Sequence, residues 1–316
     1  MQPLDDAYLS YPNRKLGMDH SRYGFASLQA RSDFSWPNGA KLGICVLVTA
    51  GFYPLNQQGK PFKVQGGMTT PYPDLRHFSL REYGNRVGIY RVLDALANSS
   101  VKPGFAVSSD LIERAPLLVQ NLCDLGEILG YGLNMDALHA GALDETSERA
   151  MIQTAAASLR DFSGQAVLGW MSPAKSQSEN TPDLLAEQGF RYCCDWVNDE
   201  LPYLQTTRTL PLIALPFSTE LEDRFVLSQN LHSDASWQQQ VCDAFDFLWQ
   251  ETEVTQQARL LTLTLHPWLI GQPHRIGALE AVLAHIEQRA ESLCFMSPCE
   301  AARHPFSEQN LERANS

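Results

Sequence analysis

The chain alternates short apolar runs with longer segments whose apolar residues recur at helical spacing. The apolar runs predict strands, and the amphipathic segments predict helices, several of which begin at a capping residue. The strands that we expect are 41–48, 104–107, 127–131, 166–171, 191–195, 212–217, 260–266 and 293–296. The helices that we expect between them are 85–98, 109–125, 144–162, 181–188, 236–253 and 276–289. Residues 49–80 interrupt the alternation with a long polar segment, which is typical of a functional or covering loop.

This alternation continues without a change of composition, which favours one α/β domain. A length of 316 residues fits one large domain or two ordinary ones. We predict a single-domain (β/α) barrel, closed or nearly so, with about seven parallel strands; an open doubly wound sheet is the alternative. The barrel is placed at 41–305, after an N-terminal arm over 1–40 and before a C-terminal tail over 306–316.

The segments with chemically useful side chains all follow predicted strands. They are 49–53, 131–139, 172–180, 195–200, 218–223 and 266–275. The carboxyl ends of the strands of a parallel barrel meet on one face, so these segments are expected to build one site.

The most informative of these segments is the last. Leu260 to Leu265 alternate Leu and Thr as a strand does, His266 stands at the strand end, and Pro267 stops the ladder. A Gly-Gln-Pro turn then delivers His274 and Arg275. Two imidazoles and a guanidinium at a strand end indicate a binding or catalytic site, and a hydrogen-bonded histidine with two solvated charges is the alternative.

Composition excludes several classes of protein. Hydrophobic residues make up 44% and charged residues 19% of the chain, which predicts a sizeable core. A formal net charge of −12 argues against general nucleic-acid binding, and no apolar run approaches membrane-spanning length. Residues 1–16 lack the apolar region of a secretory signal, and seven cysteines show no metal-type spacing. We therefore expect a cytoplasmic protein with reduced thiols.

Five segments, in order along the chain, resemble motifs of the polysaccharide deacetylase (NodB-homology) family, in the branch that contains cofactor-independent allantoinase. They are 83–88 (Tyr-Gly-Asn-Arg-Val-Gly), 169–175 (Gly-Trp-Met-Ser-Pro-Ala-Lys), 181–186, 194–199, and 265–267 with 271–277. The resemblance runs from about residue 36 to 296. It implies a distorted (β/α) barrel, hydrolysis of amide C–N bonds in N-acetyl sugars or allantoin-like rings, and self-association into homo-oligomers.

The departures from the family pattern concern the metal site. Metal-dependent members carry an Asp pair after the first strand, whereas no Asp or Glu occurs here from residue 41 to 73. Tyr131 stands where the family has a metal-binding His. Asp136, His139 and His266 remain as weak metal candidates, without the family's spacing. We therefore expect no cofactor, with zinc as the disfavoured alternative and a solvated loop position as the other interpretation of His139.

Amide hydrolysis needs a base, a group that stabilises the oxyanion, and an acid for the leaving nitrogen. His266 resembles the family's late-motif histidine, which acts as general acid. Glu220 and Asp223 are the candidates for a replacement base, or else ordinary loop carboxylates. Arg275 and Lys175 are suited to hold an anionic group of the substrate or an oxyanion.

The remaining candidates are assigned to substrate binding, each with a structural alternative. Trp170 and Trp268 would stack on a substrate ring or pack in the core. Asp195 would orient a base or cap a turn, and Ser172 lacks an obvious base for nucleophilic catalysis. The complete expected substrate-binding set is Tyr131, His139, Trp170, Ser172, Lys175, Asp195, Trp268, His274 and Arg275.

Two functions follow from different classes. The first is a metal-independent hydrolase of an amide or cyclic amide in a small substrate, with His266 at its centre. The second is a catalytically inactive barrel that keeps a small-molecule pocket. In both, the expected partners are a small molecule and other copies of the chain, with no nucleic acid and no membrane.

Overall fold

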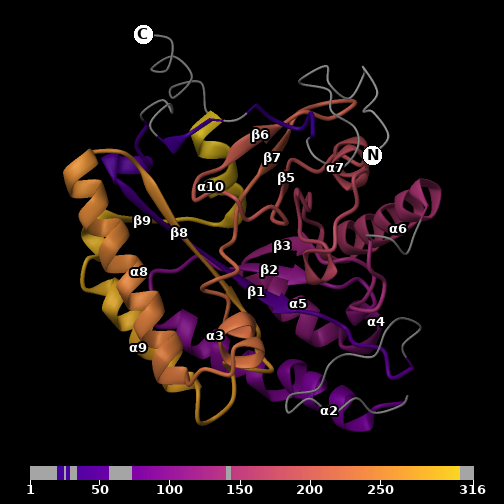
Figure 1. The fold of residues 1–316 in the computed structure, drawn as a ribbon. Helices are drawn as coiled ribbons and strands as arrows, with labels where there is room; N and C mark the ends of the chain where they lie inside the picture. The colour runs from indigo at the N-terminus through magenta and orange to yellow at the C-terminus, as the bar shows by residue number, and fades with distance from the viewer. Residues whose placement is uncertain (1–19, 25, 29–33, 57–72, 140–143, 307–316) are drawn as a thin grey trace, which may run out of the picture.

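The computed structural model describes residues 20–306, except 25, 29–33, 57–72 and 140–143 (Figure 1). Much of the predicted 1–40 arm, nearly all of the 306–316 tail and the middle of the 49–80 segment lie outside the described residues. The last part of that segment is helical, because α2 (Leu75–Tyr83) begins at Asp74, whose side chain accepts a hydrogen bond from the backbone N–H of His77. Trp36, inside the predicted arm, is buried and donates from its indole to the carbonyl of Arg259 at 2.7 Å.

One curled, mostly parallel sheet forms the centre of the molecule. Its strands are β1 (Leu42–Ala50), β2 (Gly104–Val107), β3 (Glu127–Gly130), β4 (Gly169–Trp170), β5 (Tyr192–Cys193), β6 (Tyr203–Gln205), β7 (Leu212–Ala214), β8 (Arg259–Leu265) and β9 (Leu293–Phe295). The order is β6-β7-β5-β4-β3-β2-β1-β8, with β9 paired to the start of β1. In the described part of the chain, no pairing joins β8 to β7 or β6, so the barrel is open there. The predicted distorted (β/α) barrel is confirmed.

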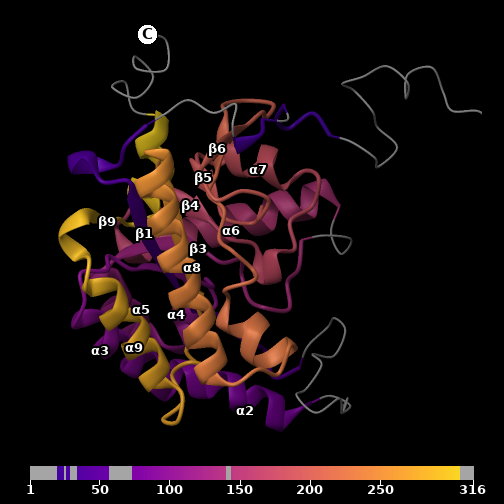
Figure 2. The same ribbon diagram turned by 60° about the vertical axis from the view of Figure 1, so that its left-hand side comes forward.

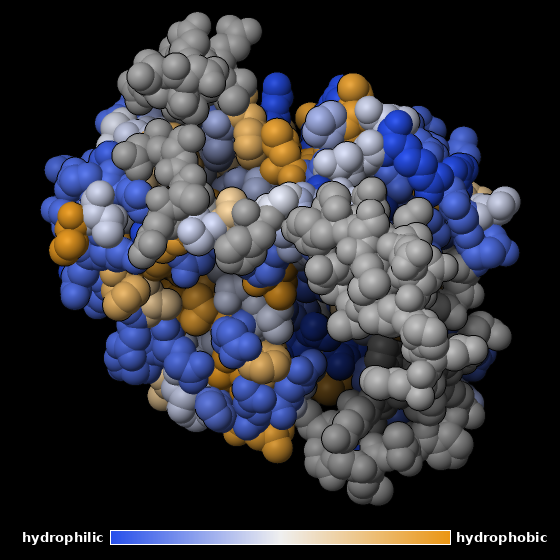
Figure 3. All heavy atoms as spheres, turned by 45° about the horizontal axis from the view of Figure 1, so that its top comes forward, coloured by the Kyte–Doolittle hydropathy of each residue, from blue (hydrophilic) through white to orange (hydrophobic). Residues whose placement is uncertain are grey.

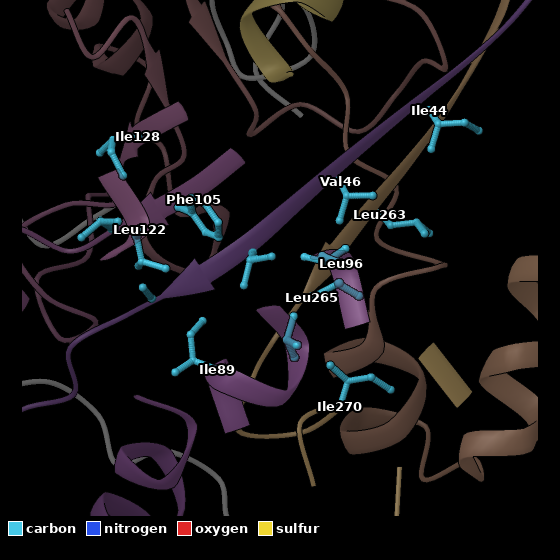
Figure 4. Packing of buried hydrophobic residues seen from close by; sticks show 14 of the residues in the cluster. Ile44, Val46, Ile89, Leu96, Phe105, Leu122, Ile128, Leu263, Leu265 and Ile270 are labelled. Carbon is cyan, nitrogen blue, oxygen red and sulfur yellow. The ribbon is translucent and has the colours of Figure 1, made fainter. Parts of the chain in front are cut away.

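Strand β1 is the centre of the core. All nine of its residues are buried, and it pairs with β8 from Leu42 opposite Arg259 to Val48 opposite Leu265. Figure 4 shows side chains of β1 and β8 beside those of α3 (Ile89–Ala97). Burial of each such aliphatic side chain contributes about 1.5–3 kcal/mol. This packing fixes the end of β8, and therefore the backbone position of His266.

Helices cover the sheet on its outer side. The helices α8 (Asp234–Thr255) and α9 (Ile276–Glu287) run side by side along the flank of β8, as both views of the ribbon show (Figures 1 and 2). The remaining α-helices after α3 are α4 (Leu111–Arg114), α5 (Pro116–Leu125), α6 (Glu145–Ser163), α7 (Thr181–Glu187) and α10 (Pro298–Arg303).

Several predicted elements differ from the structure in their details; the strands expected at 191–195 and 212–217, for example, are shortened to Tyr192–Cys193 and Leu212–Ala214. The helix expected at 109–125 is two helices, because Ala115 precedes Pro116 and takes a non-helical conformation. The helix expected at 85–98 begins as a π-helical turn, η3 (Gly84–Gly88). The strand expected at 166–171 is reduced to Gly169–Trp170, since Val167 has a φ of 44° that no strand accommodates. The antiparallel strand β6 was not predicted.

The described surface is mixed in polarity. Figure 3 shows hydrophilic side chains over most of the visible described face, with small apolar areas between them. No helix in the described part of the chain is long and apolar enough to cross a membrane. The seven cysteines all lie in described positions and are free thiols.

Candidate active site

His266, directly after β8, is the centre of the candidate site. Its side chain is 3% exposed, and its Nδ1 lies 2.7 Å from Oδ1 of the fully buried Asp223. The second oxygen of Asp223 accepts the backbone N–H of His266 at 2.8 Å. Asp223 therefore fixes both the backbone and the ring of His266. The neighbouring ring nitrogen, Nε2, is left for other partners.

That nitrogen faces a second carboxylate. Oε1 of the buried Glu222 lies 3.5 Å from Nε2 of His266 and accepts a hydrogen bond of 2.7 Å from Nε of Arg224. The other oxygen, Oε2, lies 3.5 Å from Nζ of Lys175 and has no hydrogen-bond partner among the described residues. Burial raises the pKa of Glu222, but the positive charges of His266, Arg224 and Lys175 outweigh this effect and lower the pKa to about 2. Glu222 is therefore an anion at neutral pH.

Sequence reasoning selected Asp223 but not Glu222. The structure places Asp223 against His266, whereas Glu220 is exposed to solvent. The three carboxylates stand within four positions before the π-helical turn η5 (Arg224–Gln229). Composition alone could not tell which of them face inward. The only sequence feature that sets Glu222 apart from Glu220 is its place in the Glu-Asp-Arg run at 222–224.

Lys175 is positioned by an unusual backbone. It follows Ala174, and the two residues have φ values of 54° and 56°. Non-glycine residues in this region cost about 1–3 kcal/mol each, and such strain is concentrated at functional sites. The Lys175 ammonium donates to the carbonyl of Phe217 at 2.9 Å and to Oγ1 of Thr219 at 3.3 Å. Burial lowers the pKa of Lys175, although Glu222 offsets part of this effect.

Ser172 and Asp195 join the ends of β4 and β5. Asp195 accepts the backbone N–H of Ser172 at 2.8 Å and its hydroxyl at 2.6 Å. Burial raises the pKa of Asp195, and these two hydrogen bonds act against that effect. Trp170 is fully buried, donates to the Ser172 hydroxyl at 3.2 Å and packs edge-on against Phe190. Trp170 thus packs in the core rather than being available to stack on a substrate ring. The Ser172–Asp195 pair holds the start of the loop that carries Lys175.

His139 is fully buried, so the interpretation as a solvated loop residue is wrong. Its Nδ1 lies 2.9 Å from Oε1 of the buried Glu148 in α6. Burial raises the pKa of Glu148, but hydrogen bonds from His139, Ser178 and Thr181 outweigh this effect and lower it. His139 is therefore held by α6.

The weak metal set is not brought together. His139 pairs with Glu148 and His266 with Asp223, while Asp136 is partly exposed. Throughout the described ranges, no group of three or more His, Cys, Asp or Glu side chains is arranged to hold a metal ion. Tyr131, where relatives would place a His, is buried, and its pKa is raised by burial. These residues do not fit a catalytic zinc ion, which uses three protein ligands.

His274 and Arg275 are not bonded to this centre among the described residues. His274 is exposed, and Arg275 is the residue that precedes the first turn of α9. No hydrogen bond or ion pair within the described chain joins either of them to His266.

Trp268, in contrast, packs against a charged residue that sequence reasoning missed. Trp268 is 4% exposed, and the guanidinium carbon of Arg81 lies 3.3 Å from the centroid of its ring. Arg81 belongs to α2, which begins inside the 49–80 segment that the sequence assigned to a loop and ends just beyond it. Had residues 75–83 been assigned to a helix, Arg81 could have been considered as a neighbour of the segment after His266.

Two glycines allow the segment after His266 to pack closely. A Cβ at Gly88 would lie 2.1 Å from the carbonyl oxygen of Pro267, and one at Gly271 would lie 2.4 Å from the carbonyl oxygen of Gly88. Both contacts are to backbone atoms, which cannot move aside as a flexible side chain can. The absence of a side chain at Gly88 therefore allows Pro267 to pack closely, and this packing helps to position the adjacent His266.

Comparisons with known proteins agree with this geometry. No family model matches the chain. A protein of Schizosaccharomyces pombe named "Putative polysaccharide deacetylase" is 23% identical over 281 residues, which cover 80% of this chain and 87% of that protein. A structure of a "probable Polysaccharide deacetylase" from Pseudomonas aeruginosa PAO1 is 26% identical with a TM-score of 0.73, over 87% of this chain and 94% of that one. The chain has the polysaccharide deacetylase fold.

The structure of the Puue allantoinase is also similar, with a TM-score of 0.77 and 23% identity, over 87% of this chain and 93% of that one. The resemblance to the polysaccharide deacetylases, which the sequence motifs indicated, is thereby confirmed, and the allantoinase shares the same fold. The polysaccharide deacetylase fold also agrees with the position of the site, since His266, Asp223, Lys175 and Asp195 all follow strand ends.

Proposed function

We propose that this chain is a hydrolase of non-peptide C–N bonds in the amide or cyclic amide of a small substrate. The observation that supports this most directly is the buried group of His266, Asp223 and Glu222 at the end of β8. The relatives named polysaccharide deacetylase and allantoinase supply the reaction class. A buried cluster of this kind, with polar groups that converge on one imidazole, suits a small molecule.

In this proposal His266 moves the proton. Asp223 accepts from Nδ1–H, which leaves Nε2 to take a proton from the attacking water or to give one to the leaving nitrogen. Asp223 and Glu222 both stabilise the imidazolium form. Between the two halves of the reaction the protonated ring therefore lies between two carboxylates.

Glu222 is a poor general base because its pKa is about 2. Its free oxygen Oε2 is instead suited to accept a hydrogen bond from a substrate N–H or from the water. Arg224 and Lys175 hold Glu222 in place, and their positive charges favour an oxyanion nearby. Each of these groups is fixed before substrate binds, which is the condition for electrostatic stabilisation of a transition state.

We further propose that the reaction needs no metal ion. The support is the donor set: no acid occurs from residue 41 to 73, and Tyr131 stands at the position of a ligand in metal-dependent relatives. In this proposal His266 takes the proton from water, in place of the acidic residue that serves as base after the first strand in those relatives.

The test is hydrolysis of allantoin, hydantoin, formyl-amides and N-acetylglucosamine oligomers by the wild type and by His266→Ala. His285→Ala is the matched control, because His285 is a surface histidine that also pairs with an aspartate, Asp246, at 3.1 Å. We expect turnover of at least one small substrate that His266→Ala abolishes and His285→Ala retains. Turnover that is retained in His266→Ala would refute the assignment.

A further inference from the structure

Arg81 stacks on an aromatic ring next to the proposed catalytic residue. Its guanidinium carbon lies 3.3 Å from the ring centroid of Trp268, which follows His266 by two residues. The ring of Tyr53 lies 5.2 Å away from the same carbon. A guanidinium on the face of an indole is held in a fixed plane, so its N–H groups point in fixed directions.

Three donors of this stacked pair have no acceptor. Nε and Nη1 of Arg81 and Nε1 of Trp268 are buried without a hydrogen-bond partner. Most buried donors in proteins are paired, since an unmet donor costs free energy. Burial lowers the pKa of Arg81, and a hydrogen bond that the guanidinium donates to Tyr53 offsets part of that effect. All three unpaired groups are hydrogen-bond donors, so a ligand that binds them must offer acceptor atoms.

The nearby carboxylates are engaged elsewhere. Glu222 lies against Arg224, Lys175 and His266, and Asp223 lies against His266. Among the described residues, Arg81 forms no ion pair with any carboxylate. A guanidinium whose Nε and Nη1 are buried without a counter-ion is unfavourable, and its presence on the ring of Trp268, two residues after His266, indicates that a ligand supplies the negative charge.

We propose that Arg81 and Trp268 bind a carboxylate of the substrate, so that the substrate of this hydrolase is a small amide or cyclic amide that carries one carboxylate. This inference rests on the proposed function and adds the substrate class to it. One uncompensated guanidinium matches a monoanion, and planar oxygens suit its planar donors. Trp268 supplies both the surface that orients Arg81 and one further N–H donor.

The test uses a pair of probes that differ only in charge: hydantoin-5-acetate and its neutral amide, hydantoin-5-acetamide. Binding of each probe is measured by titration calorimetry to the wild type, Arg81→Met, Arg81→Lys and Trp268→Phe. Arg76→Met is the matched control, because Arg76 is exposed on the same helix α2. Thermal unfolding of each variant establishes that it is folded; Arg81→Met is expected to keep the wild-type Tm or exceed it, since it removes an unpaired buried charge.

The wild type is expected to bind the acetate about 10- to 100-fold more tightly than the amide. Hydrogen bonds between charged groups stabilise a complex by about this much more than hydrogen bonds to a neutral group. Arg81→Met should abolish this preference and change the affinity for the amide by less than about threefold, whereas Arg76→Met should preserve it. Arg81→Lys and Trp268→Phe should each lose part of the preference. Equal affinity for the two probes in the wild type, binding of neither, or a preference that survives in Arg81→Met would overturn the inference.

Hydrolysis of the same probes is measured separately. Charge-selective, Arg81-dependent binding without turnover of any amide would refute the proposed function and leave the carboxylate site standing. Turnover of neutral and anionic amides at the same rate would support the proposed function and refute the carboxylate site.

Discussion

The role of Asp223 gives the sharpest test of how the site works, and Asp223→Asn is the smallest change that addresses it. Asp223 accepts two hydrogen bonds, from the backbone N–H and from Nδ1 of His266. An amide has only one oxygen, so its NH₂ must replace one of these acceptors. Two donors cannot face each other, and the backbone N–H cannot change. The NH₂ therefore turns toward Nδ1, which must then lose its proton and accept.

This rearrangement moves the imidazole proton to Nε2, the nitrogen that faces Glu222. The neutral ring then has no free acceptor for a proton from water, and the imidazolium loses an adjacent negative charge. The corresponding substitution in a serine protease triad costs about 10⁴-fold in kcat. Because Glu222 remains at 3.5 Å and still supports the charged ring, we expect a loss of about 10²- to 10⁴-fold here. KM should change by less than about threefold, since Asp223 has no exposed surface for substrate.

The assay is steady-state kinetics on the best small amide substrate across neutral pH, with folding checked by circular dichroism. Asp246→Asn is the control, because Asp246 pairs with His285 on the surface between α8 and α9. It should leave kcat unchanged. A kcat for Asp223→Asn within about threefold of the wild type would show that the tautomer of His266 is irrelevant, and the mechanism would fail.

Two further predictions concern neighbours of His266. Glu222 has a folded-state pKa of about 2, below its ordinary value of 4.5, so it adds stability above pH 4.5 that is lost as the pH falls toward 2. Urea unfolding should therefore find Glu222→Gln less stable than the wild type by on the order of 3 kcal/mol at pH 7, with a smaller difference at pH 3; a difference independent of pH would contradict this. Gly88→Ala should lower kcat at least about tenfold by displacing Pro267, whereas Gly277→Ala, with open space around its Cβ, should not. Equal activity of the two alanine variants would show that the close approach does not position His266.

The sequence predicted the barrel because its strands and helices carry their own local signals. The 260–265 strand alternates, lies beside β1, and ends in a stop at Pro267, so the position of His266 followed from pattern alone. The 75–83 helix carried no such signal, because its apolar spacing is poor and it follows a long polar stretch. The helix is held by its cap at Asp74 and by tertiary contact, including the stacking of Arg81 on Trp268.

The choice among carboxylates was beyond the sequence for a different reason. Whether Glu220 or Glu222 faces His266 depends on the backbone conformation of the turn that leads into η5, which the residue types do not determine. His274 and Arg275 show the same limitation. Their spacing from His266 was compatible with a return over the site, yet His274 is exposed and Arg275 stands at the start of α9.

The central claim, that His266 catalyses hydrolysis without a metal ion, is tested most directly by the turnover of chelated protein. The purified chain is treated with EDTA, and the hydrolysis of allantoin, hydantoins, cyclic imides, formyl-amides and N-acetylglucosamine oligomers is measured with and without added zinc, with His266→Ala in parallel. The account predicts turnover of a small amide that survives chelation, is not raised by zinc and disappears in His266→Ala. Turnover that requires zinc, or no turnover of any substrate in either condition, would contradict it, and the second result would favour a barrel that binds a small molecule without converting it.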